Sequence, residues 1–142
     1  MHDTYRGYKR LLPGSAFPLG ELMRTVLALG LDPSFVELPA SSTLDPELVR
    51  AFVDAHLDRL RGLGYDVISC LVDAGETAEA VTEKWLRSRE FDCVMIGAGL
   101  RAPDKLLLFE KLLNLVHTRA PAAKLCFNTS PADTAEAVQR WM

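Results

Sequence analysis

The chain has 142 residues, the size of one ordinary domain, and 49% of them are hydrophobic while 25% are charged. This composition excludes a disordered tail, a collagen-like fibre and a coiled-coil rod, and the apolar stretch from Leu106 to Phe109 is far short of the roughly 20 residues that a membrane span needs. The formal net charge of -3 provides no overall positive field, so we expect neither a nucleic acid nor a membrane as a partner.

The three cysteines, Cys70, Cys93 and Cys126, each lie inside a short apolar run, and none belongs to a C-x-x-C pair. A buried thiol behaves as a small hydrophobic side chain, and we expect all three to be buried in this way. Unpaired thiols are typical of a reducing compartment, so the sequence favours a cytoplasmic location.

The first 22 residues show no sustained periodicity. Pro13 and Pro18 interrupt the apolar stretch that a secretory signal would need, so a signal peptide is not indicated. We therefore divide the chain into an N-terminal arm, residues 1–22, and a single α/β domain, residues 23–142. The arm has aromatic side chains that can anchor it on its own domain or on a neighbouring subunit: Tyr5, Tyr8 and Phe17.

From residue 24 onward, strand-like and helix-like segments alternate four times. Short apolar runs predict strands at 25–31, 66–72, 92–97 and 124–128. Their apolar character is continuous, which is typical of strands that are buried on both faces of a parallel sheet.

The helix after the first strand has clear start and stop signals. Asp45 as N-cap and Pro46 at the first helical position are a favoured pair, and Gly62 and Gly64 end the helix. Its apolar stripe consists of Val49, Phe52, Val53, Leu60 and Leu63. The long loop 32–45 before this helix can fold over the end of the sheet as a lid.

Three further helices follow the later strands. Asp73 and Glu76 indicate a capping box at the start of the second helix. The third helix is predicted over residues 103–119. The fourth has Ser130 as its N-cap and extends to Trp141.

Strands that alternate with helices, joined by right-handed crossovers, predict a four-stranded parallel sheet in the order 2-1-3-4 between two helix layers. This is a single-domain three-layer α/β/α sandwich of flavodoxin-like or Rossmann-like type. In such sheets ligands bind outside the carboxyl ends of the strands, at the point where the strand order reverses. Here that point lies between the first and third strands.

Three polar loops are expected to meet at this switch point. The candidate ligand-binding residues are Asp32, Ser34, Gly97, Gly99, Arg101, Asn128 and Thr129. Arg101 can hold a carboxylate or phosphate, or it can pair with Asp104 or Asp32 instead. The two glycines can bring backbone N–H groups close to a substrate oxygen, or they can simply make the turn.

Gly97, Gly99 and Ala102 fit the pattern G-x-G-x-x-A after a predicted strand and before a predicted helix. This segment of about a dozen residues resembles the dinucleotide fingerprint of flavin-dependent amine oxidases, which implies close approach of the backbone to a pyrophosphate. The sequence departs from that fingerprint at two positions. Asn128 lies near the place of the ribose-binding acid, and Asp104 puts negative charge at the start of the helix.

The span 91–128 also resembles the closing half of universal stress proteins. Both have a strand, a glycine loop, a long helix, an alanine-proline break and a last strand in the same order. Members of that family that bind ATP carry G-x-x-G and a later G-[ST], whereas no glycine follows Gly99 in this chain. The resemblance is therefore one of layout.

Motifs of several enzyme classes are absent from the sequence, including G-x-x-x-x-G-K-[ST], H-E-x-x-H and G-x-S-x-G. The phosphoacceptor aspartate of a receiver domain would end the third strand, where this chain has Gly97. The three histidines, His2, His56 and His117, do not converge at the switch point. We assign no metal site, no cofactor and no catalytic residue, and leave open whether the protein is an enzyme.

Two functional hypotheses follow. The first is a protein that binds a small polar or anionic ligand at the carboxyl ends of the first and third strands. The second is a non-enzymatic homo-oligomeric interaction protein whose crevice is incidental. Nucleic acid is not an expected partner in either case.

The helix predicted at 103–119 favours oligomerisation. Its apolar side chains cover an arc of roughly 180°, whereas a helix on a sheet usually has a stripe a little over 100° wide. These side chains are Leu106, Leu108, Phe109, Leu112, Leu113, Leu115 and Val116. We expect a homodimer with this helix at or near the interface, the alternative being that the arm 1–22 covers the helix.

Overall fold

The computed structural model describes residues 23–38, 41 and 43–142, so the N-terminal arm 1–22 lies outside the described residues. Four parallel strands form one sheet in the order β2-β1-β3-β4. They are β1 (Thr25–Leu31), β2 (Asp66–Val72), β3 (Cys93–Ile96) and β4 (Lys124–Phe127). The predicted strand order is confirmed, and the arrangement is consistent with an α/β sandwich of flavodoxin or Rossmann type.

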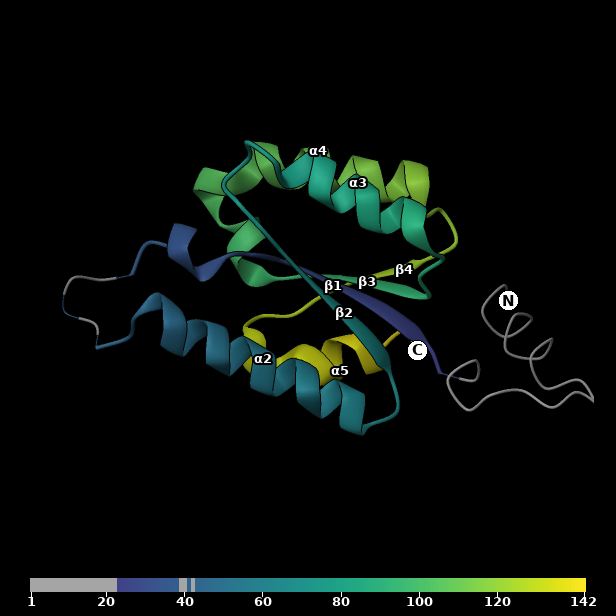
Figure 1. Cartoon of the computed structure of the whole chain (residues 1–142), viewed down its shortest axis with the longest axis horizontal. Coiled ribbons are helices and arrows are strands. Elements are labelled where there is room, and N and C mark those ends of the chain that lie inside the picture. Colours follow the sequence, from purple (N-terminus) through teal and green to yellow (C-terminus); the bar gives the residue numbers. More distant parts are fainter. Residues whose placement is uncertain (1–22, 39–40, 42) are drawn as a thin grey trace, which may run out of the picture.

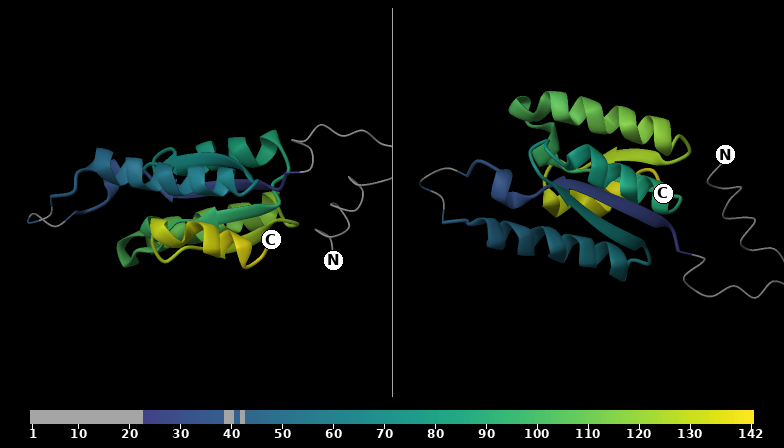
Figure 2. Two further views of the ribbon diagram at one scale, coloured as in Figure 1. Left: turned by 90° about the horizontal axis from the view of Figure 1, so that it is seen from below. Right: turned by 45° about the horizontal axis from the view of Figure 1, so that its top comes forward.

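Helices cover both faces of the sheet (Figure 1). The helices α3 (Ala78–Ser88) and α4 (Leu106–Arg119) pack on one face, and α2 (Pro46–Gly62) and α5 (Thr134–Gln139) pack on the other. Figure 2 shows the same layers from two further directions. Within the described ranges, no helix has the length and apolar content that crossing a bilayer requires.

The central strands β1 and β3 are the best buried part of the sheet. Side chains alternate between the faces, so that Leu27 and Leu29 join the core under α3 and α4, while Val26 and Ala28 join the core under α2 and α5. The strand β3 is shorter than the predicted 92–97. Its flanking residues still extend the backbone pairing, because the N–H of Gly97 donates to the Leu29 carbonyl at 2.8 Å.

Two helix starts agree with their sequence signals. Asp45 accepts a hydrogen bond from the Leu48 N–H at 2.8 Å, and Pro46 is the first residue of α2. Ser130 and Asp133 form a capping box around a short 3₁₀ turn, Pro131–Asp133, that leads into α5. The prediction that this helix extends to Trp141 is wrong, because α5 ends at Gln139.

The predicted capping box of α3 is wrong. The N-cap of this helix is Thr77, which makes no side-chain capping bond. Asp73 lies before the helix and accepts from the N–H groups of Gly75 and Thr77 at about 3 Å, so it stabilises the turn that precedes the helix. That turn requires Gly75, whose φ of +137° is strained for other residues.

The cysteines behave as predicted. Cys70, Cys93 and Cys126 are buried and unpaired by disulfides. Burial raises the pKa of the Cys70 thiol to about 11, so this thiol is protonated at neutral pH. The sulfur atoms of Cys93 and Cys126 lie 3.4 Å apart between β3 and β4 and form part of the core under α5.

Candidate functional site

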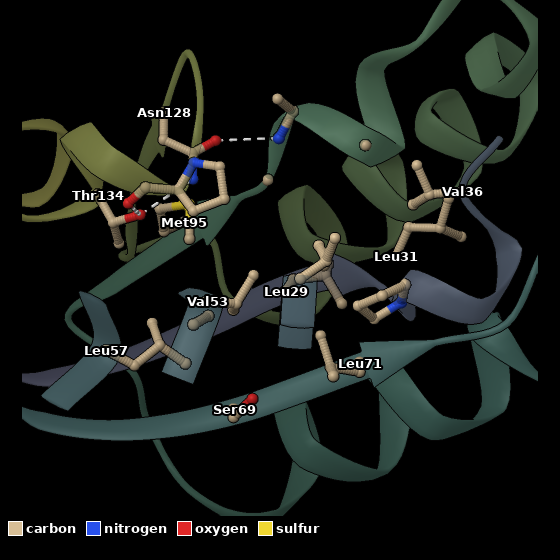
Figure 3. Close-up of a pocket in the computed structure, with 18 residues that line it drawn as sticks. Leu29, Leu31, Val36, Val53, Leu57, Ser69, Leu71, Met95, Asn128 and Thr134 are labelled. Atoms are coloured by element: carbon tan, nitrogen blue, oxygen red, sulfur yellow. Dashed lines mark hydrogen bonds between the residues drawn. The ribbon is translucent and has the colours of Figure 1, made fainter. Parts of the chain in front are cut away.

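A cavity of about 200 Å³ lies between α2 and the carboxyl end of the sheet (Figure 3). Strands β1, β2 and β3 form its floor, and the loops after β1, β3 and β4 complete its walls. Eighteen residues line it: Ala28, Leu29, Gly30, Leu31, Pro33, Val36, Val49, Val53, Leu57, Ser69, Leu71, Met95, Gly97, Ala98, Gly99, Asn128, Pro131 and Thr134. Most of these side chains are apolar.

The cavity arises because side chains on the α2 face of the sheet become smaller towards the carboxyl end. On β1 this face has Val26, then Ala28, then Gly30. On the neighbouring β3, the next position on this face after the end of the strand is Gly97. Near the amino ends of the strands, the larger side chains fill the space between the sheet and the helix. Near the carboxyl ends, the smaller side chains leave a gap.

The burial of α2 follows the same gradient. Leu57 and Leu60 in its second half are 2% and 0% exposed, whereas Val49 and Val53 in its first half are only half-buried. Val49, Val53 and Leu57 therefore form the wall of the cavity opposite the sheet. The cavity lies at the switch point between β1 and β3, where ligands bind in open α/β sheets.

A buried amide closes the cavity at the β4 side. Asn128 is 4% exposed, and its Oδ1 accepts from the Ala98 N–H at 2.9 Å. Its Nδ2 donates to Thr134 Oγ1 at 3.1 Å, and the Thr134 hydroxyl donates to the Pro131 carbonyl at 2.7 Å. This chain of hydrogen bonds fixes the loop after β3 to the loop after β4.

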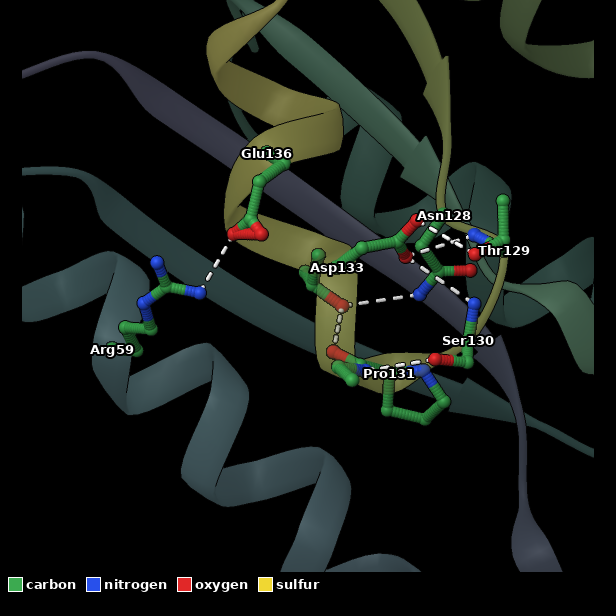
Figure 4. A network of polar contacts seen from close by, with 9 residues as sticks. Arg59, Asn128, Thr129, Ser130, Pro131, Asp133 and Glu136 are labelled. Atoms are coloured by element: carbon green, nitrogen blue, oxygen red, sulfur yellow. Dashed lines mark hydrogen bonds and ion pairs between the residues drawn. The ribbon is translucent and has the colours of Figure 1, made fainter.

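The loop after β4 is further stabilised by a carboxylate (Figure 4). Asp133 accepts from the Thr129 N–H at 2.9 Å, from the Thr129 hydroxyl at 2.7 Å and from the Ser130 N–H at 3.2 Å. These bonds favour the charged form and lower the pKa of Asp133, and the Thr129 hydroxyl contributes most. Thr129 therefore serves the start of α5 and does not line the cavity.

Asp32 and Ser34 form a local structure of their own after β1. Asp32 caps the 3₁₀ turn Pro33–Phe35 by accepting from the Ser34 N–H at 2.9 Å and from the Ser34 hydroxyl at 2.8 Å. Arg50 of α2 donates to the same carboxylate at 2.7 Å. The pKa of Asp32 is lowered, chiefly by the Ser34 N–H and further by the Ser34 hydroxyl and Arg50. This contact ties the first half of α2 to the end of β1.

Arg101 binds the backbone. Its guanidinium donates to the Ile96 carbonyl at 2.5 Å and to the Asn128 carbonyl, and it lies 5.1 Å from the centre of the Phe127 ring. One side chain therefore bridges the carboxyl ends of β3 and β4. Burial lowers the pKa of Arg101, and the negative charge of Asp133 partly offsets this effect.

The predicted ion pair of Arg101 with Asp104 or Asp32 is wrong. Asp104 pairs with Lys105 at 2.7 Å, and Asp32 pairs with Arg50 at the same distance. The carbonyls that Arg101 binds are backbone groups at strand ends, which the sequence pattern does not distinguish from any others.

The seven candidate residues gather at the carboxyl end of the sheet, in three loops. Gly97, Gly99 and Asn128 line the cavity. Four do not: Asp32, Ser34, Arg101 and Thr129. The N–H groups of Gly97 and Ala98 are bound to the Leu29 carbonyl and to Asn128, so they are not directed at a substrate oxygen.

The geometry after β3 differs from a dinucleotide fingerprint, in which the glycines open a helix. The residues Ala98–Arg101 form a 3₁₀ turn, a second such turn follows at Pro103–Lys105, and α4 begins only at Leu106. Gly99 packs against Leu31, where a Cβ would make an ordinary contact of 3.4 Å with the Leu31 Cβ.

Sequence reasoning missed the apolar wall of the site. The sequence pattern places Val49 and Val53 in the core stripe of α2 and predicts Ala28 and Ser69 only as strand residues. The signal that can find them is the decreasing side-chain size along one face of β1. This signal requires the strand register and the neighbouring helix to be known at the same time.

Groups of three or more histidine, cysteine, aspartate or glutamate side chains that could hold a metal ion do not occur among the described residues. Comparison of the whole chain with protein-family models gives no match, and comparison with curated protein sequences gives none.

Proposed function

We propose that the protein binds a small molecule in the cavity at the carboxyl ends of β1 and β3. The observation that carries this proposal is the cavity of about 200 Å³ at the switch point of the sheet. A cavity of this volume can hold a molecule about the size of a single aromatic ring. Its position at the strand ends, with three loops around it, supports binding.

The ordered rim also supports binding. Asn128, Asp32 and Arg101 each fix one loop with hydrogen bonds that need no ligand. A cavity with a rim that is already ordered loses little conformational entropy when a ligand enters, which favours affinity.

A thermal-shift and ligand-observed NMR screen of the full chain tests the proposal. Compounds small enough for the cavity are expected to raise the melting temperature in a saturable manner. A ligand at a hundred times its dissociation constant adds about 2.7 kcal/mol to the free energy of unfolding. A broad set of small polar, anionic and apolar compounds that neither bind nor stabilise the protein at millimolar concentration would contradict it.

A second function, homodimerisation through α4, is favoured by a specific observation. Leu106 and Leu107 at the start of α4 are 60% and 72% exposed. The rest of the predicted arc serves the fold, because Leu108, Leu112 and Val116 are buried in the core. We propose that a second copy of the chain covers the two exposed leucines, since a small monomer seldom leaves such side chains unused.

Sedimentation of the full chain and of two matched variants tests the dimer. The wild type is expected to be a dimer at micromolar concentration, and the double change Leu106→Glu and Leu107→Glu is expected to give a folded monomer. The control carries Leu48→Glu and Phe52→Glu on α2, whose side chains are 53% and 46% exposed, and it is expected to stay dimeric. A wild type that is monomeric, or a dimer that survives the α4 change, would refute the interface.

We further propose that the protein works in the reducing cytoplasm, which is supported by three buried cysteines that form no disulfide within the described structure.

A further inference from the structure

We infer that the ligand of the proposed cavity is an uncharged, mainly apolar molecule that makes one hydrogen bond to the Ser69 hydroxyl. This inference rests on the proposed function and narrows it to a chemical class. It replaces the anion expected from Arg101 by a neutral ligand, for reasons that lie in the lining of the cavity.

The lining contains no charge. Among the eighteen described residues around the cavity, none has an ionisable side chain, and the polar side chains are Ser69, Asn128 and Thr134. A charged group that leaves water for such surroundings is strongly disfavoured unless a partner charge compensates for it. The lining therefore selects against carboxylates, phosphates and ammonium groups.

Two guanidinium groups at this end of the sheet already bind partners within the protein. The Arg50 guanidinium holds Asp32, and the Arg101 guanidinium holds two strand-end carbonyls. Neither guanidinium lines the cavity, and these contacts hold each of them outside it, so neither compensates the charge of an anion inside. The existing bonds therefore reinforce the preference for a neutral ligand.

One polar side chain of the lining makes no hydrogen bond among the described residues. The Asn128 amide and the Thr134 hydroxyl are joined to each other and to backbone groups. Ser69 lines the cavity from β2, and its hydroxyl has no hydrogen-bond partner among the described residues (Figure 3). A ligand hydroxyl, amide or carbonyl can bond to it, which orients the apolar body of the ligand towards Val49, Val53 and Met95.

The volume limits the size of the ligand. An apolar cavity of about 150 Å³ can hold one benzene molecule, so a cavity of about 200 Å³ accommodates one aromatic ring with a small substituent of up to about three further non-hydrogen atoms. Single-ring probes of this kind can therefore measure the preference of the cavity directly.

The experiment compares two matched pairs of probes with the full chain. Benzamide and benzoate have nearly the same shape and differ in charge, while phenol and toluene differ in one hydroxyl group. The readout combines titration calorimetry with the NMR signal of methyl-labelled methionine. Met95 lines the cavity and reports binding there, whereas Met23 lies at the amino end of β1 and serves as a remote control.

We expect benzamide to bind at least about tenfold more tightly than benzoate and to shift the Met95 signal while leaving Met23 unchanged. The change Ser69→Ala is expected to weaken phenol about fivefold and to leave toluene unchanged, because it removes one hydrogen bond without filling the cavity. This difference separates a bonding role of Ser69 from a general effect on the fold.

Other results would overturn the inference in distinguishable ways. If benzoate binds as tightly as benzamide and shifts Met95, the neutral class is wrong and the proposed cavity function stands. If Ser69→Ala affects phenol and toluene equally, the hydrogen bond to Ser69 is wrong. If none of the four probes binds or shifts Met95 while another compound of the broad screen does, the ligand class inferred here is wrong, and if no compound of that screen binds, the proposed function itself fails.

Discussion

The change Ala28→Leu is expected to abolish ligand binding, with a loss of at least about a hundredfold in affinity, and at the same time to stabilise the ligand-free protein. Ala28 is 4% exposed and faces the cavity from the middle of β1. A leucine there extends into the gap below Val49 and Val53 and occupies the volume that a ligand needs. Filling an internal cavity commonly adds about 1 kcal/mol to the free energy of unfolding.

Calorimetry and urea denaturation measure the two effects in the same variant. The matched control is Ala78→Leu, because Ala78 is 0% exposed and lies outside the cavity lining. A leucine in that filled part of the core is expected to destabilise the protein by about 1–3 kcal/mol. If Ala28→Leu destabilised the protein as much as the control does, the cavity would be closed in solution. If ligands still bound to Ala28→Leu, their site would lie elsewhere.

The loss of affinity and the gain in stability expected for Ala28→Leu both follow from the cavity. A site that is required for binding but not for folding costs stability in the ligand-free state, because its lining loses packing contacts. The small residues Ala28 and Gly30 leave the space that the proposed ligand would occupy. The β1 strand would bury more apolar surface with larger side chains at both positions.

The strand order could be predicted because local and long-range signals agree. Each strand is a continuous apolar run, each crossover contains a helix, and clear start signals mark the first helix, at Asp45 with Pro46, and the turn into the last one, at Ser130 with Asp133. Such signals depend on neighbouring residues and survive in any tertiary context. The parallel order 2-1-3-4 then follows from the handedness of the crossovers.

The roles of the polar residues at the site could not be predicted in the same way. In the sequence, Asp32 and Thr129 are free to bind a ligand. In the structure each makes hydrogen bonds to a residue a few positions away, Asp32 with Ser34 and Thr129 with Asp133. Short polar side chains after a strand commonly bond to the adjacent backbone or cap the next turn. A polar residue at a strand end is therefore a candidate for binding only when its local partners are excluded.

The sequence also overestimates how many apolar side chains of the third predicted helix lack a partner inside the domain. Six of the seven side chains in the predicted arc, all except Leu106, pack in the core between α4, the sheet and α3, and Phe109 packs edge-on against Phe127 at a centroid distance of 5.9 Å. A helix at the edge of a sheet that also contacts a parallel helix needs a wider stripe than one on a sheet alone. What remains exposed is confined to Leu106 and Leu107.

The change Arg101→Ala is expected to destabilise the fold by about 2–3 kcal/mol and to leave the relative affinities of neutral and anionic probes unchanged. The half-buried guanidinium bonds two carbonyls, at the ends of β3 and β4, and a hydrogen bond that involves a charged group contributes about 1.5–3 kcal/mol. Loss of the contact with Phe127 adds a smaller effect. Water that reaches the two carbonyls in the variant offsets part of the loss.

Urea denaturation of Arg101→Ala beside Arg140→Ala checks this role. Arg140 also donates to a strand-end carbonyl, that of Phe127 at 2.9 Å, but it is exposed and makes one such bond, so its removal is expected to cost no more than about 0.5 kcal/mol. The change Arg101→Lys keeps the charge and loses the planar fork that spans two carbonyls, so it is expected to behave like alanine. If lysine instead restored stability, or if Arg101→Ala selectively removed binding of benzoate in a stable protein, Arg101 would be an anion-binding residue. The bond pattern at the ends of β3 and β4 argues for the structural role, because both carbonyls lose their partner when the guanidinium turns towards a ligand.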